Sequence, residues 1–236
     1  MSIKFVQCQN LAEIGEKASQ LFIKQVKSDP NSVFILATGS SPLSTYKAIV
    51  QDYKINHTDW SKVVTFNLDE YIDLDKRYSN QSYRYFMHEN LFWHINIKHT
   101  YFPTKELIGD KYQKLINQYH QVDLAILGVG NNGHIAFNEP GTPINTETHI
   151  VNLTLSSRQA NARFFNDDID SVPKAAITMG LKEILAAKKI LLIASGSAKK
   201  IAINHLKRAK AFDSNWPITA LINHDNVIVF TSNLDD

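Results

Sequence analysis

The chain has very little cysteine, with Cys8 the only one among 236 residues. One thiol cannot form an intramolecular disulfide, and it excludes a metal site built from several cysteine thiolates. Chains that do not depend on disulfides are typical of reducing compartments. We therefore expect a cytoplasmic protein.

The chain also lacks a long apolar run. No stretch approaches the ~18 uninterrupted apolar residues that a membrane helix needs. The N-terminal segment carries Lys4, Glu13, Glu16 and Lys17, which argues against an ordinary signal peptide. The sequence therefore predicts no membrane partner.

An excess of charge of one sign is missing as well. The 25 Lys and Arg residues nearly balance the 23 Asp and Glu residues, which leaves a formal net charge of +2. The basic residues are scattered, whereas a nucleic-acid surface gathers them on one face. We expect no nucleic-acid partner, although a small anionic ligand is compatible with this balance.

Apolar residues are plentiful, at 44% of the chain. Short apolar runs at 33–37, 63–66, 124–127 and 190–194 alternate with longer segments of mixed polarity. This alternation is typical of a parallel sheet with helices on both faces. We predict a doubly wound, mostly parallel, Rossmann-like α/β fold in which residues 1–236 form a single domain.

Other elements follow from periodicity and from helix start signals. Two more short strands are expected at 218–221 and 227–230, as a hairpin or as two edge strands around residues 224–226. Helices are expected at 42–53, 81–93, 106–119, 158–165 and 198–210. In open sheets of this kind ligands bind beyond the carboxyl ends of the strands, so the residues that follow each apolar run are the candidates for a site.

The segment GVGNNGHIAFNEPGT (128–142) begins with the G-x-G-x-x-G pattern of dinucleotide-binding proteins. The apolar run before it supplies the required strand, but Pro140 and Pro143 preclude the helix that should follow. Glu139 and Glu147 come too early to be the acidic residue that binds the ribose about 20 positions on. We therefore expect no nucleotide cofactor.

What remains is a glycine-rich loop that presents Asn132, His134 and Glu139. A lone histidine is most often structural or exposed, but a nearby acid can orient its ring for proton transfer. The histidines and the single cysteine do not show the spacing of a metal site. We expect no metal and no other cofactor.

Two segments have the features of anion sites. TGSSP (38–42) is a tight turn into a helix, in which Ser41 can cap, Pro42 suits the first helical position, and the free amides of the helix start can bind an anion. A capped helix start without a ligand is the alternative. SGSAKK (195–200) puts Lys199 in a first helical turn, where the helix dipole disfavours a cation unless an anion shares the site.

Two further segments allow a functional and a structural interpretation. In NLDEYI (67–72) the acids are either solvated loop charges or include a general base at the edge of the sheet, for which Asp69 is our candidate. In NARFF (161–165), Arg163 either lies along an apolar surface or grips phosphate oxygens. Together with His134, these segments suit proton transfer on a small phosphorylated substrate.

Four segments, TFNLDEY (65–71), GVGNNGHIAFNEPGT (128–142), NARFF and SGSAKK, occur in the order of the glucosamine-6-phosphate deaminase family, which the chain resembles over nearly its whole length. The block GHIAFNEPG (133–141) is highly specific to that family. The resemblance implies conversion of glucosamine 6-phosphate and water to fructose 6-phosphate and ammonia, without a metal or a nucleotide.

The resemblance also implies roles for individual residues. His134 assists opening of the sugar ring, and Asp69 moves a proton from C2 to C1. Glu139 and Asn132 hold and polarise His134. The implied phosphate-binding residues are Gly39, Ser40, Ser41, Arg163 and Lys199.

Two departures from the family pattern lead to predictions. Many members have Asp where this chain has Asn132, so we hypothesise that Glu139 is the main acidic support of His134. The longer hexameric branch binds an activating sugar phosphate through basic residues at positions that His149 and Val151 occupy here, and through a C-terminal extension. We therefore expect a short non-allosteric form, a monomer or small homo-oligomer, with hyperbolic kinetics.

Three alternative functions would convert other substrates, or no substrate. 6-Phosphogluconolactonases share the fold and the histidine loop, but continue differently after the histidine and do not require NLDEY. A galactosamine-6-phosphate deaminase is compatible with the sequence, since nothing in it reveals what contacts the C4 hydroxyl. A non-catalytic sugar-phosphate sensor would bind the ligand and release no ammonia.

Overall fold

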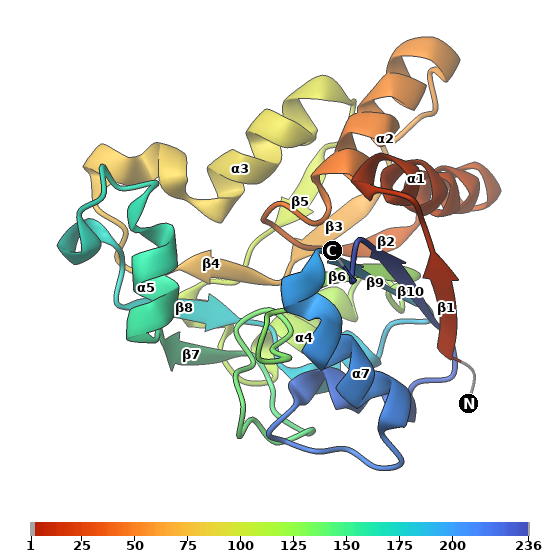
Figure 1. The fold of residues 1–236 in the computed structure, drawn as a ribbon. Helices are drawn as coiled ribbons and strands as arrows, with labels where there is room; N and C mark the ends of the chain where they lie inside the picture. The colour runs from red at the N-terminus through yellow and green to blue at the C-terminus, as the bar shows by residue number, and fades with distance from the viewer. Residues whose placement is uncertain (1–2, 236) are drawn as a thin grey trace.

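A seven-stranded sheet forms the centre of the computed structural model, which describes residues 3–235 (Figure 1). Every neighbouring pair of strands in this main sheet is parallel. The predicted runs at 33–37, 63–66, 124–127 and 190–194 lie in it, which confirms the prediction of a mostly parallel sheet. Across the sheet the order is β1 (Ile3–Gln7), β10 (Val227–Ser232), β9 (Ile190–Ser195), β6 (Leu124–Gly128), β2 (Val33–Leu36), β3 (Val64–Asn67) and β5 (His99–Tyr101).

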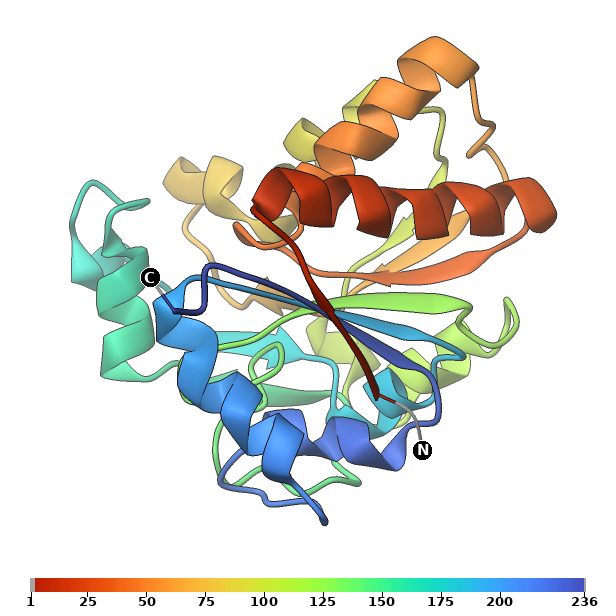
Figure 2. The ribbon, with the colours of Figure 1, turned by 45° about the vertical axis from the view of Figure 1, so that its right-hand side comes forward.

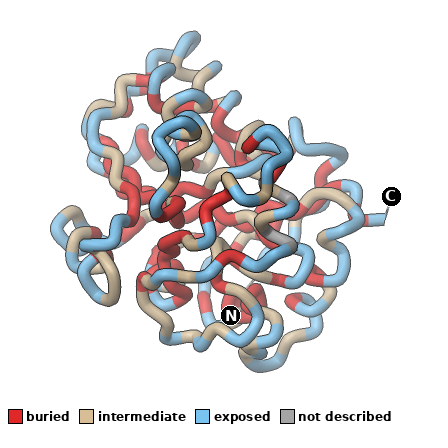
Figure 3. Tube along the Cα trace, turned by 90° about the vertical axis from the view of Figure 1, so that its left-hand side faces the viewer, coloured by how far each residue is buried: buried red, intermediate tan, exposed pale blue. Residues whose placement is uncertain are grey.

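Helices cover both faces of the main sheet, as Figure 2 shows. Successive side chains of a strand point to opposite faces, so Phe34 and Leu36 of β2 belong to one core and Val33 and Ile35 to the other. The buried segments, red in Figure 3, gather in the interior. The first core is covered by α1 (Leu11–Ser28), α2 (Leu43–Asn56) and α3 (Tyr83–Asn90), the second by α4 (Lys111–Ile116), α6 (Leu181–Leu185) and α7 (Lys200–Arg208).

The strand order reverses between β2 and β6. From β2 the chain proceeds to β3 and β5 on one side, whereas β6 lies on the other side of β2 and is followed by β9 and β10. The loops after β2 and β6 therefore diverge at this point. A crevice at such a switch point is where open α/β sheets bind their ligands.

A second, antiparallel sheet extends beyond the main one (Figure 1). Its order is β4 (Asp69–Tyr71), β8 (Ala175–Thr178) and β7 (His149–Asn152), and it packs beside α5 (Leu155–Ala162) and η4 (Ile169–Ser171), a 3₁₀ helix. Its own apolar cluster includes Tyr71, Phe165 and Ala176. The sequence did not predict this small sheet, which holds the backbone of Asp69.

The strand predicted at 218–221 is wrong, because these residues belong to the 3₁₀ helix η6 (Pro217–Asn223). Pro217 opens it with a fixed φ and no N–H to offer to a ladder. The hydroxyl of Thr219 donates to the carbonyl of Trp216 at 2.8 Å and accepts from the amide of Asp213 at 2.8 Å, which holds the turn closed. The expected hairpin is also absent from the described part of the chain, since β10 is parallel to both of its neighbours.

The predicted helices are present with shifted ends. The segment 106–119 is interrupted near Gly109, whose φ of +70° breaks the helix between η3 (Lys105–Leu107) and α4. The prediction omitted α1, which Asn10 caps by accepting from the amide of Glu13 at 3.0 Å. Within residues 3–235, none of the helices combines the length and the apolar character needed to cross a bilayer.

Candidate active site

A cavity of about 840 Å³ lies at the switch point, within the size range of small-molecule sites. Its walls come from the loops after β2, β3 and β6, from α3, from the C-terminal end of α5, and from Lys199 just before α7. Among the nine predicted site residues, Asn132 and Glu139 lie outside the lining. The seven that line the cavity are Gly39, Ser40, Ser41, Asp69, His134, Arg163 and Lys199.

The loop after β2 presents a helix start to the cavity. Gly39 has a φ of +90°, a conformation that favours glycine, and α2 begins at Leu43 with Pro42 as its N-cap. No side chain within residues 3–235 caps this helix, so Ser41 does not have the capping role that we predicted. The first amides of α2 and the positive end of its dipole are therefore available to an anion.

Two cations also line the cavity. Lys199, at the end of η5 (Ser197–Lys199), donates from Nζ to Oδ1 of Asn131 at 2.8 Å, and burial lowers the pKa of its ammonium group. The guanidinium of Arg163 lies over the ring of Phe164, 4.7 Å from its centre. Both interpretations of Arg163 thus have support, since the side chain covers an apolar ring and also lines the cavity.

Asp69 is the buried acid of the cavity. The residue is 7% exposed, and Oδ1 has no hydrogen-bond partner among the described residues. Burial, together with the negative charge of Glu70, raises the pKa of Asp69 to about 8. Glu70 itself accepts from the amides of Tyr71, Tyr83 and Arg84 at 2.8 to 2.9 Å, so it anchors the start of α3 to β4.

His134 lies at the end of the loop after β6, packed tightly against Gly130. A Cβ added at Gly130 would lie 2.4 Å from Cε1 of the His134 ring, so only glycine leaves room for this placement. The amide of Gly130 donates to the carbonyl of His134 at 2.9 Å and closes the loop.

Glu139 faces the ring of His134. Its Oε1 lies 3.3 Å from Nδ1, within ion-pair distance but not aligned as a hydrogen bond. Burial by itself would raise the pKa of Glu139, but His134 and Asn132 hold it below its usual value. The carboxylate is therefore the charged partner of the histidine.

The hydrogen bonds of Asn132 to the described residues do not include one to the imidazole. Its Nδ2 donates to Oε2 of Glu139 at 2.7 Å, and its Oδ1 accepts from the amide of His134 at 3.3 Å. The amide side chain thus orients the carboxylate, and the carboxylate in turn faces the ring.

Contacts that the sequence did not indicate support these residues from behind. Trp216 packs on Gly133, where an added Cβ would lie 2.8 Å from its ring, and stacks on His205 of α7 at 3.7 Å. The amide of Asn161 donates to the hydroxyl of Tyr71 at 3.0 Å and ties α5 to β4. Asn161 and Tyr71 lie within segments that we had singled out, whereas Trp216 had no sequence signal.

Comparisons with known proteins agree with this geometry. The family model described as glucosamine-6-phosphate isomerases/6-phosphogluconolactonase matches residues 9–230. The chain is 46% identical to a glucosamine-6-phosphate deaminase of Malacoplasma penetrans, covering 97% of this chain and 98% of that protein. It is 42% identical to one of Halalkalibacterium halodurans, covering 96% and 94%.

Solved structures give the same result. A monomeric glucosamine-6-phosphate deaminase superposes with a TM-score of 0.91 at 35% identity, over 98% of both chains. A 6-phosphogluconolactonase of Thermotoga maritima, 18% identical with a TM-score of 0.73 over 98% of this chain and 100% of that one, shares the fold. On these matches, the chain belongs to the glucosamine-6-phosphate isomerase/6-phosphogluconolactonase family.

Proposed function

We propose that this protein is a glucosamine-6-phosphate deaminase, which converts glucosamine 6-phosphate and water to fructose 6-phosphate and ammonia. One observation carries the proposal: a single cavity combines a buried acid of raised pKa, a histidine backed by a carboxylate, a helix start without a side-chain cap, and two cations. The near full-length likeness to deaminases supports the same reaction.

The phosphate of the substrate binds at the start of α2. The amides of Gly39, Ser40 and Ser41 face it together with the helix dipole, and Lys199 and Arg163 supply positive charge. Holding the phosphate at this end places the sugar across the cavity, toward Asp69 and His134.

Ring opening is the first chemical step. The C1 hydroxyl loses its proton, the bond between C1 and the ring oxygen breaks, and the ring oxygen gains a proton. With Nδ1 of His134 facing Glu139, the other ring nitrogen is left to shuttle this proton. The product is the open-chain amino aldehyde.

Asp69 then carries out the isomerisation. Its carboxylate removes the proton from C2 and returns it to C1, while the aldehyde oxygen takes a proton and the C2 amine becomes an imine. Water adds to this imine, and ammonia leaves as the C2 ketone forms. An acid with a pKa of about 8 suits both halves of the transfer, because it takes up and releases a proton near neutral pH.

Ammonia release from glucosamine 6-phosphate tests the proposal directly. Galactosamine 6-phosphate and 6-phosphogluconolactone serve as comparison substrates. We expect rapid release from the glucosamine compound. Binding of the sugar phosphate without release of ammonia would instead support a sensor, and faster turnover of a comparison substrate would reassign the enzyme.

We predict that Glu139→Gln harms turnover more than Asn132→Ala. The first change removes the charge 3.3 Å from Nδ1 of His134, whereas the second removes a side chain that hydrogen-bonds to the carboxylate and to the backbone of His134. We expect kcat to fall about 10²-fold for Glu139→Gln and about tenfold for Asn132→Ala. Steady-state rates of the two purified variants check this, and equal or reversed effects would refute it.

We also propose that the enzyme is a monomer with hyperbolic, unactivated kinetics. The likeness to a monomeric deaminase supports the oligomeric state. At the positions of the activator-binding residues, Nδ1 of His149 contacts the carbonyl of Glu147 at 2.9 Å and Val151 is apolar. Initial rates with and without N-acetylglucosamine 6-phosphate should coincide, and a sigmoidal curve that this compound abolishes would contradict the prediction.

The same reasoning extends to domain organisation and location. The cavity draws its lining from residues as far apart as Ala37 and Lys199, which supports our proposal of one functional domain over residues 1–236. We also propose a cytoplasmic location, because a charged sugar phosphate does not cross a bilayer unaided.

A further inference from the structure

Two consecutive asparagines in the histidine loop contact opposite ends of the site. Oδ1 of Asn131 accepts from Nζ of Lys199 at 2.8 Å. Nδ2 of Asn132 donates to Oε2 of Glu139 at 2.7 Å, and this carboxylate faces His134. One peptide unit thus separates a contact to the phosphate-binding lysine from a contact to the carboxylate of the histidine.

The contact to Lys199 is unusual in its electrostatics. Among the described residues no carboxylate pairs with this half-buried ammonium, and an amide oxygen compensates its charge only in part. An ammonium has three donors. Asn131 occupies one of them, so a phosphate can bind to Lys199 without displacing Asn131.

Asn131 itself is exposed and does not line the cavity. It therefore has no direct access to the reacting carbons. Asn131 does, however, lie within the turn that positions His134. The amide of Gly130, on one side of Asn131 in the sequence, donates to the carbonyl of His134, on the other side, at 2.9 Å. A displacement of the Asn131 side chain therefore shifts the hydrogen-bonded turn that positions His134.

We infer that Asn131 is a positioning residue that couples occupation of the phosphate site to the placement of His134. This inference rests on the proposed function, in which Lys199 binds phosphate and His134 transfers a proton. In the free enzyme the loop is tied to Lys199, whose long side chain has no other hydrogen-bond partner in the part of the chain that the structure describes. Bound phosphate restrains the ammonium of Lys199 from the other side. The loop that is hydrogen-bonded to Lys199 then becomes less mobile as well.

The coupling has a catalytic benefit. The phosphate group does not react, yet its binding free energy can raise kcat if it improves the geometry at the reacting atoms. Removing Asn131 should therefore lower kcat more than it raises KM. A residue with only a structural role would not show this larger effect on kcat than on KM.

Hydrogen exchange of the Gly130 amide provides a readout that does not depend on turnover. This amide reports closure of the turn through its bond to the His134 carbonyl. We expect inorganic phosphate to slow its exchange in the wild type. In Asn131→Ala, phosphate should bind within about threefold of the wild-type affinity but leave the exchange unchanged, and kcat should fall about tenfold.

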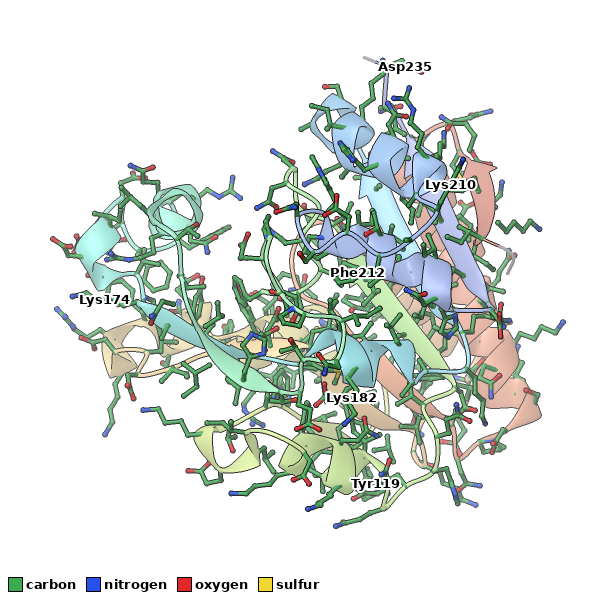
Figure 4. The ribbon with its side chains drawn as sticks, turned by 90° about the horizontal axis from the view of Figure 1, so that it is seen from below. Tyr119, Lys174, Lys182, Lys210, Phe212 and Asp235 are labelled. Carbon is green, nitrogen blue, oxygen red and sulfur yellow. The ribbon has the colours of Figure 1, made fainter. Side chains whose placement is uncertain are left out.

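Two further variants sharpen the test. Lys200→Ala is the matched control, because Lys200, the first residue of α7, pairs instead with Asp235 at 2.7 Å, and the variant should behave like the wild type. Figure 4 labels Asp235, near the C-terminal end of the described chain. Asn131→Asp keeps an acceptor for Lys199 and should restore the protection of Gly130. It should also weaken phosphate binding about tenfold, because its carboxylate neutralises the ammonium and repels the phosphate.

The outcomes separate this inference from the proposed function. Equal protection of Gly130 by phosphate in Asn131→Ala and in the wild type would overturn the coupling, as would complete loss of phosphate binding in Asn131→Ala. Loss of protection with retained binding would support it. That result would hold even if the wild type released no ammonia, an outcome that would overturn only the proposed function.

Discussion

Replacing Asp69 with asparagine should abolish most ammonia release. The amide cannot take the proton from C2, and general bases contribute about 10²–10⁴-fold to such steps, so we expect kcat to fall by about 10³-fold. Phosphate binding should persist, because the cradle at the start of α2 is untouched. Rates of ammonia release and the affinity for inorganic phosphate, measured on the same preparations, check both halves of the prediction.

The same substitution should stabilise the protein. In the unfolded chain the carboxyl of Asp69 ionises near its ordinary pKa of 3.8, whereas in the folded protein it keeps its proton until about pH 8. Between these values the folded state binds one proton more than the unfolded state, so this group lowers the free energy of unfolding as pH rises. Asparagine carries no charge to bury, and the shift from 3.8 to about 8 corresponds to a gain of up to about 5 kcal/mol at pH 8.

Urea unfolding of both proteins at pH 5 and at pH 8 measures this gain. The advantage of the variant should be small at pH 5, grow through pH 8 and then level off. The kcat/KM of the wild type should rise toward pH 8 as Asp69 ionises in the free enzyme. A stability difference that does not change between pH 5 and pH 8 would contradict the assignment of the buried, protonated acid.

Gly130→Ala should misplace the imidazole of His134 while leaving its chemical identity unchanged. The added methyl group would lie 2.4 to 2.5 Å from three atoms of the imidazole, so the ring must move. The φ of Gly130 is not positive, so the backbone accepts alanine and the effect arises from this clash. Misplacing a catalytic group by about 1 Å costs about 10²-fold in rate, and we expect kcat to fall by that factor.

A double-mutant cycle with His134→Gln isolates this effect. If the methyl group acts through the histidine, Gly130→Ala should change the residual kcat of His134→Gln by less than about threefold. An equal loss in both backgrounds would show that the loop contributes to catalysis by another route.

The strands that could be predicted from the sequence are those buried on both faces of the main sheet. The runs that became β2, β3, β6 and β9 are apolar on both faces because helices cover both, and their continuous apolar character is visible in sequence. The strands of the small sheet are three or four residues long, and Asp69 pairs with Thr178 across more than a hundred positions. No local pattern encodes such a pairing. The apolar segment 218–221 resembled a strand in composition, but Pro217 and the hydroxyl of Thr219 turned it into a helix.

The gathering of candidate side chains around one cavity was more predictable, because these side chains lie in loops that follow strand ends. Asp69 and His134 come just after β3 and β6, and parallel strands bring such residues to one edge. The supporting contacts were not foreseen for two reasons. Trp216 reaches Gly133 only through the tertiary fold, and Asn131 has an amide whose importance depends entirely on Lys199.

The small antiparallel sheet has a consequence for how the enzyme tolerates heat. β4 begins at Asp69, pairs with β8 and packs in a separate apolar cluster around Phe165, whereas Leu68 just before it belongs to one of the two large cores. Segments with few buried contacts open before the rest of a protein. Activity should therefore disappear at a temperature at which circular dichroism still detects the intact main sheet. The inactivation temperature would then measure the unfolding of the small sheet formed by β4, β7 and β8.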